Sequence, residues 1–205
     1  MCKICGSLTK NIFINKVNYE FCDYCGFLCK TKDYILSSED EYNRYLLHSN
    51  SENENYINYQ KKFYDEINDF LGEKVLDYGC GDNHILANIL KENGHDSMYY
   101  DLYFYPDIKY EKYLYDAIIL EEVIEHLNDP LSVITKLIKL LNINGKLIIR
   151  TNFIPKNVVE KNWWYLRDIT HISFFDIKTF QYIGNLLSMR IIYCNEKDLI
   201  VFEKA

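Results

Sequence analysis

Strand-like and helix-like hydrophobic patterns alternate along the chain from residue 74 to the C-terminus. Short apolar runs typical of buried strands stand at 75–77, 97–101, 116–120 and 146–151. Runs with hydrophobic residues three or four positions apart predict helices over 83–91, from 129 and from 176. Gly94 suits the end of the first helix and Pro130 the start of the second. This alternation predicts an α/β fold, a mostly parallel sheet covered by helices on both faces.

The last two hydrophobic runs differ from the others in how they are connected. RIIYC at 190–194 and LIVFE at 199–203 are separated only by the turn NEKD. A connection this short makes two strands antiparallel. The predicted sheet is therefore parallel with an antiparallel hairpin at its end.

Two helices are expected between residues 35 and 71. Ser38 and Glu41 have the spacing of a capping box, which predicts a helix over 39–48. The polar stretch SNSENEN ends that helix, and a second helix is expected over 56–71. One face of the second helix carries Tyr56, Tyr59, Phe63, Ile67 and Phe70.

Residues 1–34 form a separate unit with a different pattern, namely two pairs of cysteines around short β-like runs. Their spacing is C-x2-C-x16-C-x2-C, formed by Cys2, Cys5, Cys22 and Cys25. Four thiolates at this spacing predict a closed, structural zinc site, a zinc ribbon, and Cys29 is a spectator. A unit this small would draw much of its folding free energy from the metal. A pair of metal-free dithiols is the alternative.

Composition narrows the partners and the compartment. The chain has 205 residues and a formal net charge of −7, which argues against a nucleic-acid partner. There is no apolar run of about 18 residues and no leader with a basic start, so no membrane span and a cytoplasmic location are expected. The oligomeric state does not follow from the sequence.

The stretch VLDYGCGDNHI, residues 75–85, carries the strongest ligand signal. Gly79 and Gly81 allow a sharp turn and a close approach of backbone to a ligand. Asp101 ends the next strand, where an acid can accept the hydroxyls of a ribose. A dinucleotide generally requires a third glycine and a nucleoside triphosphate a lysine, and both are missing here. S-adenosylmethionine has a ribose and cationic groups, which suit an acid-rich loop.

Three motifs in order resemble the class I S-adenosylmethionine-dependent methyltransferases. They are VLDYGCGDN followed by Asp101, then YDAIILEEVIEHLNDP, then NGKLIIRT, and the resemblance spans about residues 72–203. It implies a Rossmann-like, seven-stranded sheet with an antiparallel last strand in a domain of residues 72–205. Residues 35–71 would then supply helices that cap the cofactor cleft.

The resemblance also assigns cofactor-binding residues. A cradle for the methionine end is implied at Asp77, Gly79, Cys80 and Gly81, contacts with the ribose and adenine at Asp101 and Leu102, and the floor at Leu120, Glu121 and Glu122. Asn83 stands where the family commonly has a glycine, at a position that often needs positive φ, and asparagine tolerates that region well. Tyr45, His48 and Tyr56 are expected to close over the cofactor.

The motif EEVIEH and the later His171 give the candidate catalytic residues, Glu122, His126 and His171. A helical turn over 121–127 would place Glu122, Glu125 and His126 on one face. Similar motifs occur in small-RNA 2′-O-methyltransferases and ubiquinone-pathway O-methyltransferases, where they are associated with a divalent cation. Three interpretations stay open: a second metal at these four side chains, a histidine general base, or an acidic first turn that only complements a helix dipole.

The stretch WWYLRDITHISFF is expected to help form the acceptor site. One of Trp163 and Trp164 should line a pocket, and Arg167 should either meet an anionic group of the acceptor or pair with Asp168. The pattern is similar to bacterial methyltransferases that act on small molecules or cell-surface sugars. We expect methyl transfer to a small-molecule or glycan acceptor, on oxygen. An RNA methyltransferase and a catalytically silent interaction module are the alternatives.

Overall fold

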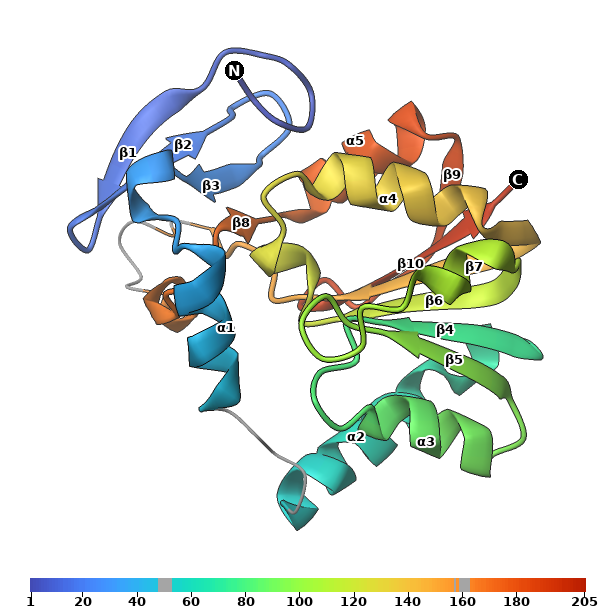
Figure 1. The fold of residues 1–205 in the computed structure, drawn as a ribbon. Helices are drawn as coiled ribbons and strands as arrows, with labels where there is room; N and C mark the ends of the chain where they lie inside the picture. The colour runs from blue at the N-terminus through green and yellow to red at the C-terminus, as the bar shows by residue number, and fades with distance from the viewer. Residues whose placement is uncertain (48–52, 157, 159–162) are drawn as a thin grey trace.

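The computed structural model describes residues 1–47, 53–156, 158 and 163–205, which form two sheets flanked by helices (Figure 1). The larger sheet has the strand order β5-β4-β6-β7-β10-β9. Its strands are β4 (Lys74–Tyr78), β5 (Asp96–Tyr100), β6 (Tyr115–Glu121), β7 (Leu141–Arg150), β9 (Met189–Cys194) and β10 (Leu199–Lys204). The first four are parallel, and β10 runs antiparallel to both β7 and β9. The predicted parallel sheet and its antiparallel hairpin are confirmed.

This sheet has six strands within the described residues, where the resemblance implied seven. Only residues 101–114 lie between β5 and β6. They hold a bridge between Asp101 and Tyr105 and the short 3-10 helix η3 (Ile108–Lys112). One parallel crossover needs a dozen or more residues. The segment is therefore long enough to connect β5 to β6 and too short for a further strand with its own crossover.

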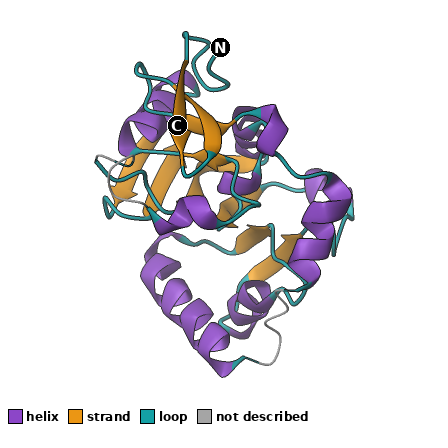
Figure 2. Ribbon diagram, turned by 90° about the vertical axis from the view of Figure 1, so that its left-hand side faces the viewer, coloured by secondary structure: helices purple, strands orange, loops and turns teal. Residues whose placement is uncertain are grey.

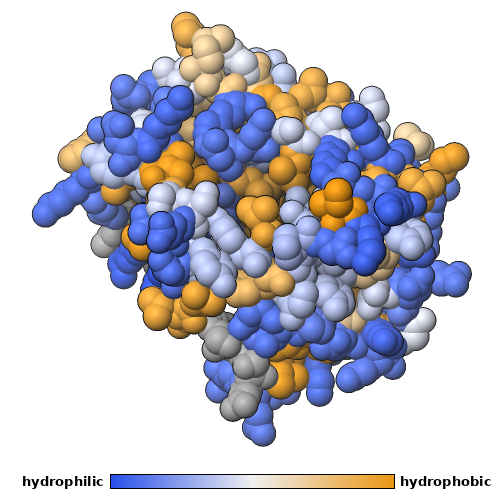
Figure 3. Space-filling model, viewed as in Figure 1, coloured by the Kyte–Doolittle hydropathy of each residue, from blue (hydrophilic) through white to orange (hydrophobic). Residues whose placement is uncertain are grey.

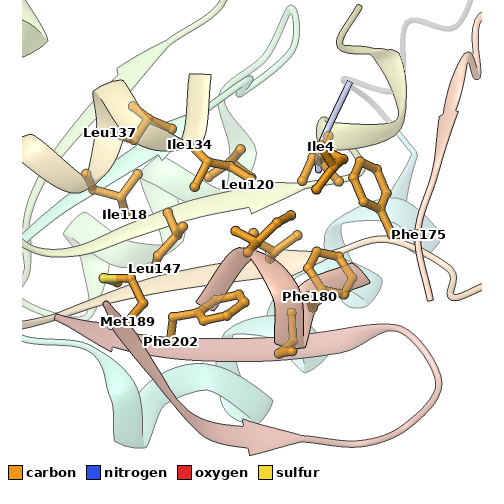
Figure 4. Packing of buried hydrophobic residues seen from close by; sticks show 14 of the residues in the cluster. Ile4, Ile118, Leu120, Ile134, Leu137, Leu147, Phe175, Phe180, Met189 and Phe202 are labelled. Atoms are coloured by element: carbon orange, nitrogen blue, oxygen red, sulfur yellow. The ribbon is translucent and has the colours of Figure 1, made fainter. Parts of the chain in front are cut away.

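Helices cover both faces of the large sheet (Figures 1 and 2). On one face lie α2 (Glu54–Ile67), which continues into η2 (Asn68–Phe70), and α3 (Ile85–Glu92). On the other lie α4 (Pro130–Lys139) and α5 (Ile177–Leu186). Alternate strand residues point to opposite faces. Ile119 and Ile148 accordingly pack with Phe63 of α2, whereas Ile118, Leu120 and Leu147 pack with the α4–α5 layer, as Figure 4 shows.

Helix starts follow local capping chemistry. The first helix, α1 (Ser38–Leu46), is capped by Ser37, whose side chain accepts a hydrogen bond from the Asp40 N–H, so the predicted cap at Ser38 is one residue late. Asn53 caps α2, which begins two residues before the predicted start. In α4, Asp129 is the cap and Pro130 the first residue, as predicted. Leu141 lies beyond this helix and begins β7.

The smaller sheet joins the N-terminal unit to a short strand of the large domain. It consists of β1 (Lys10–Ile14), β2 (Val17–Phe21), β3 (Leu28–Lys30) and β8 (Ser173–Phe174), all paired antiparallel. The N-terminal unit and the larger domain also share a hydrophobic core, in which Ile4 lies beside Phe175 (Figure 4). No helix among the described residues is long and apolar enough to span a membrane.

Candidate functional site

A cavity of about 430 Å³ opens where β4, β5 and β6 end, at their carboxyl ends. This is the edge where parallel α/β sheets bind ligands. Of the predicted cofactor residues, those lining it are Gly79, Cys80, Gly81, Asp101, Leu102, Glu121 and Glu122. The predicted catalytic residues Glu122, His126 and His171 line the same cavity. Figure 3 shows hydrophobic side chains in a recess of this face among hydrophilic ones.

Two predicted cofactor residues lie behind the cavity wall. Leu120 is fully buried in the core (Figure 4). Asp77 is also buried, and its Oδ2 has no hydrogen-bond partner among the described residues. Burial raises the pKa of Asp77 to about 7. This carboxyl group is thus held just below the loop without a full set of partners.

The loop after β4 is shaped by its glycines. Gly79 has φ +88°, and a Cβ there would lie 2.3 Å from Cγ2 of Val123, so this position requires glycine. The N–H groups of Gly79 and Cys80 both donate to the carbonyl oxygen of Tyr100, at 2.7 and 3.1 Å. The loop is therefore fixed against the end of β5, with its backbone facing the cavity.

Asp101 connects this loop to the following turn. Its Oδ2 accepts from the Gly81 N–H at 3.1 Å, and its Oδ1 accepts from the N–H groups of Tyr103 and Phe104 at 2.9 and 3.1 Å. A carboxylate offers roughly four acceptor positions. Three are used by backbone, which leaves one to face a ligand in the cavity.

Among the non-glycine residues of this loop, positive φ falls on His84, at φ 39°, and not on Asn83, where the resemblance placed it. The Asn83 side chain instead donates to Oδ1 of Asp82 at 2.6 Å. The His84 ring stacks on Tyr99, with ring centroids 4.3 Å apart, and bonds the Tyr105 hydroxyl. These contacts stabilise a backbone conformation that histidine adopts less readily than glycine.

Buried carboxyl groups give the cavity floor its electrostatic character. Burial raises the pKa of Glu121 to about 8, and its Oε1 has no partner among the described residues. Burial also raises the pKa values of Glu122 and, still more, of Glu125, which is fully buried beside Glu122. A cationic ligand would favour ionisation of these groups and would be stabilised by them in return.

A tyrosine that the sequence did not single out organises two of these acids. The Tyr165 hydroxyl lies 2.9 Å from Oε2 of Glu122, is in hydrogen-bond contact with Oε1 of Glu125, and lies 3.1 Å from Oγ1 of Thr151. One hydroxyl proton cannot serve two carboxylates fully, which agrees with the raised pKa values of the pair. The one sequence signal was the position of Tyr165 in the WWY cluster.

The expected helical turn over 121–127 is only partly present. A 3-10 turn, η4, covers Ile124–His126, and Glu122 lies before it at φ 51°. Ligand atoms of Glu125, His126 and His171 lie within 4.8 Å of one another. Glu122, whose carboxylate bonds Tyr165, is not part of this group.

The two histidines face each other, with ring centroids 4.8 Å apart. His126 Nδ1 lies 3.2 Å from the carbonyl oxygen of Thr170, and His171 Nδ1 lies 3.0 Å from that of Tyr165. A carbonyl accepts only, so both Nδ1 atoms carry hydrogen, and both Nε2 atoms are acceptors with no hydrogen bond to the described residues. Burial, then the neighbouring His171, lowers the pKa of His126 to about 3, and burial lowers that of His171. Both rings are neutral at physiological pH.

The remaining predicted residues belong to the WWYLRDITHISFF stretch and to the capping helices, and only some of them line the cavity. Trp163 is buried in a cluster with Phe174, Trp164 is 60% exposed, and neither lines this cavity. Asp168 accepts from the N–H and hydroxyl of Thr170, at 2.9 and 2.7 Å, and not from the exposed Arg167. Tyr45 and Tyr56 line the cavity, as expected of residues that close over it. His48 lies outside the described residues.

The four N-terminal cysteines form a second cluster of potential ligands. All four are free thiols, and their sulfur atoms lie within 4.8 Å of one another. Cys2 and Cys25 are 3.6 Å apart and Cys5 and Cys22 are 3.4 Å apart. Sulfur atoms around a tetrahedral zinc would be about 3.8 Å apart, given a Zn–S bond of about 2.3 Å. The cluster therefore fits a metal of this kind.

Comparison with known proteins agrees with this geometry. A family model described as a methyltransferase domain matches residues 47–184, well over half of the chain. The chain belongs to this family of methyltransferase domains. No curated protein is significantly similar to it in sequence.

Solved structures share the fold at low sequence identity. An O-methyltransferase family protein from Burkholderia thailandensis has a TM-score of 0.54 at 11% identity, over 73% of this chain and 57% of that one. A SAM-dependent methyltransferase from Archaeoglobus fulgidus has a TM-score of 0.53 at 20% identity, over 71% of this chain and 92% of that one. The mitomycin 7-O-methyltransferase has a TM-score of 0.50 at 11% identity, over 64% of this chain and 49% of that one. The chain thus spans about half the length of the first and third of these proteins.

Proposed function

We propose that the protein transfers a methyl group from S-adenosylmethionine to a hydroxyl group of a small-molecule or glycan acceptor. The observation that carries this proposal is one cavity that brings together the glycine loop, Asp101, buried acids and two neutral imidazoles. The acids suit the cationic donor, and the imidazoles suit a hydroxyl that must lose a proton.

The residues present fit this cofactor. Asp77 and Glu121 each have a buried carboxyl oxygen without a partner among the described residues, and these oxygens can stabilise a cation in the cavity. Asp101 has an acceptor position left for a ribose hydroxyl, and Leu102, 64% exposed at the rim, would cover the adenine. Cys80 and Glu122 would complete the wall around the methionine end, and Leu120 would support the floor from behind.

When bound, the cofactor supplies an electrophilic methyl group on a sulfonium. The protein then mainly has to position the acceptor and take up its proton. We assign proton uptake to Nε2 of His126, whose Nδ1–H is fixed by the carbonyl of Thr170. The adjacent Glu125 would stabilise the imidazolium, His171 would face the acceptor beside His126, and Glu122 would hold Tyr165 in place.

A second candidate role for the same group is metal binding. Glu125, His126 and His171 offer one carboxylate and two neutral imidazoles, a set that suits Mn²⁺, Mg²⁺ or Zn²⁺. In that case the metal would orient the acceptor hydroxyl and lower its pKa. Dialysis against a chelator, with metal analysis to check that the cysteine site keeps its zinc, separates the two roles. With the cysteine site filled, a base would keep working, whereas a metal site at Glu125, His126 and His171 would lose activity and regain it with one added cation.

For the N-terminal cluster we propose a structural zinc ion held by Cys2, Cys5, Cys22 and Cys25. The sulfur spacing supports this assignment, and three of the four residues are buried. Four thiolates would complete the tetrahedral coordination of the zinc, so no position would stay open for catalysis. Cys29 lies in β3 and is outside this cluster.

The acceptor class rests on charge and cavity size. The net charge is −7, and the cavity of about 430 Å³ is of the size that small ligands occupy. The mitomycin 7-O-methyltransferase, which shares the fold, has a small-molecule acceptor by name. An RNA acceptor is the weaker alternative because it would require a basic surface.

Calorimetric titration with S-adenosylhomocysteine tests the proposal. Wild type should bind in the micromolar range, and Asp101→Ala should weaken binding at least tenfold by loosening both loops and losing the ribose contact. Asp107→Ala is the matched control, because Asp107 lies on the exposed side of the same segment. A folded wild type that does not bind the compound would contradict the proposal and favour a silent interaction module.

A further inference from the structure

A second cavity of about 380 Å³ lies next to the cofactor cavity. The two cavities share His126 and Thr170. The outer walls of the second cavity come from the segment that leaves the N-terminal unit, at Lys32, and from the start of α1, at Glu41. A ligand in it would therefore contact His126, a residue that also lines the cofactor cavity.

The polar groups around this cavity are unequally occupied. Glu41 accepts from the Tyr45 and Tyr103 hydroxyls, at 3.1 and 2.6 Å, so each of its carboxylate oxygens already has a donor. Both the side-chain and backbone oxygens of Asn128 accept from the Lys3 ammonium, at 2.7 and 3.0 Å. The acceptors on this wall are therefore used within the protein.

Two donors on this wall have no partner among the described residues. The Asn128 side-chain NH₂ makes no hydrogen bond within the part of the chain that the structure describes, and Lys3 holds the amide in that orientation. The Lys32 ammonium is exposed and has no hydrogen bond or ion pair in the same ranges. Free donors with a positive charge select a ligand that brings acceptor oxygens and negative charge. Ile35 and Ile169 supply an apolar wall for its carbon skeleton.

We propose that this second cavity is the acceptor subsite and that it takes a hydroxylated small molecule bearing a carboxylate or phosphate. The anionic group lies at Lys32 and Asn128, and the reacting hydroxyl lies at His126. The inference rests on the proposed methyl transfer and adds the chemical class of the acceptor to it. The cavity volume suits one small molecule and excludes a folded polymer.

The test uses the full chain saturated with S-adenosylhomocysteine and labelled with ¹⁵N at histidine. Three probes share a sugar ring: glucose 6-phosphate, glucuronate and uncharged methyl glucoside. Imidazole signals of His126, assigned with His126→Gln, report binding at the wall shared by both cavities. We expect one or both anionic probes to bind at least tenfold more tightly than methyl glucoside, and the tighter of the two identifies the anion.

Variants locate the anion. Lys32→Met should weaken the anionic probe at least tenfold, and Asn128→Asp, which keeps an oxygen for Lys3, should weaken it by a similar factor. Lys91→Met is the matched control, since Lys91 is an exposed lysine of α3 on the opposite side of the large sheet, and it should change nothing (Figure 1).

The outcomes separate this inference from the proposed function. If the wild type fails to take up S-adenosylhomocysteine, both fail. If it takes up that compound but binds the three probes equally or not at all, or if Lys32→Met binds the anion like wild type, only the acceptor subsite is overturned.

Discussion

The N-terminal unit and the large domain are stabilised in different ways. The large domain buries two apolar layers, one on each face of its sheet, around residues such as Ile118 and Ile119. The N-terminal unit has few buried apolar residues of its own, and several of its buried positions are cysteines. Apolar burial alone can support the large domain, whereas the N-terminal unit depends on its sulfur cluster and on its contact with the large domain.

That contact also shapes the site. Lys30, only 5% exposed, reaches from β3 to the carbonyl oxygens of Asp168 and Ile169, at 2.9 and 3.1 Å. The backbone N–H of Lys30 donates to the carbonyl of Ile172 at 2.9 Å. The segment between these contacts carries Thr170 and His171. The small unit therefore helps to order the acceptor side, whereas the cofactor loop is held entirely within the large domain.

Loss of the metal site should have the largest effect, and this effect should fall on the N-terminal unit. Cys25→Ser would remove one of four thiolates, and structural zinc contributes on the order of 10 kcal/mol to small isolated units. We expect the variant to lose bound zinc and to unfold its N-terminal unit, seen as a lowered melting temperature and less than 0.2 zinc per chain. Cys194→Ser, a half-buried cysteine outside the cluster, should keep zinc and stability. A zinc-free wild type of full stability would show that the two regions are stabilised alike.

Tyr165→Phe should have the next largest effect and should act through the large domain. The change removes the hydroxyl shared by Glu122, Glu125 and Thr151, which should lower the free energy of unfolding by about 1–3 kcal/mol. Urea titration measures it. Tyr19→Phe is the control, because Tyr19 is equally buried and its hydroxyl has no hydrogen bond within the described residues. Equal stability losses in the two variants would remove any special role for the Tyr165 hydroxyl.

Cofactor affinity should depend on pH through the large domain alone. Burial raises the pKa of Asp77 to about 7 and of Glu121 to about 8, so the free folded protein holds these protons above pH 4, where an unfolded chain releases them. Their contribution to stability is full below about pH 4 and is lost as pH rises through 7 to 8. A bound cation instead favours the ionised form of both carboxyl groups. S-adenosylmethionine should bind about tenfold more tightly at pH 8 than at pH 6 from Asp77 alone.

The control for this pH effect is S-adenosylhomocysteine, which lacks the sulfonium charge. Its affinity should change less over the same range, as measured by calorimetry. Equal pH dependence of the two compounds would mean that the buried acids do not sense the sulfonium.

The sequence predicted what local patterns determine and missed what distant segments build together. Strand and helix alternation was enough for the parallel sheet, and the glycine loop for the position of the cavity. Ser37 and Ser38 are both good N-cap residues for α1, so packing and not the local sequence decided which of them caps the helix. A two-residue strand such as β8 has no sequence period to detect. The Tyr165–Glu122 contact and the second cavity arise only when residues more than 40 positions apart meet.

The most direct test of the difference between the two regions is hydrogen exchange with and without zinc, in protein saturated with S-adenosylhomocysteine. Zinc removal should speed exchange of amides at 26–31 and, through β3 and Lys30, at 168–174, while the loop at 77–81 keeps its protection and the ligand stays bound. Unchanged protection at 168–174 would contradict the coupling of the N-terminal unit to the acceptor side. Loss of protection at 77–81 would show that the cofactor loop depends on the metal as well.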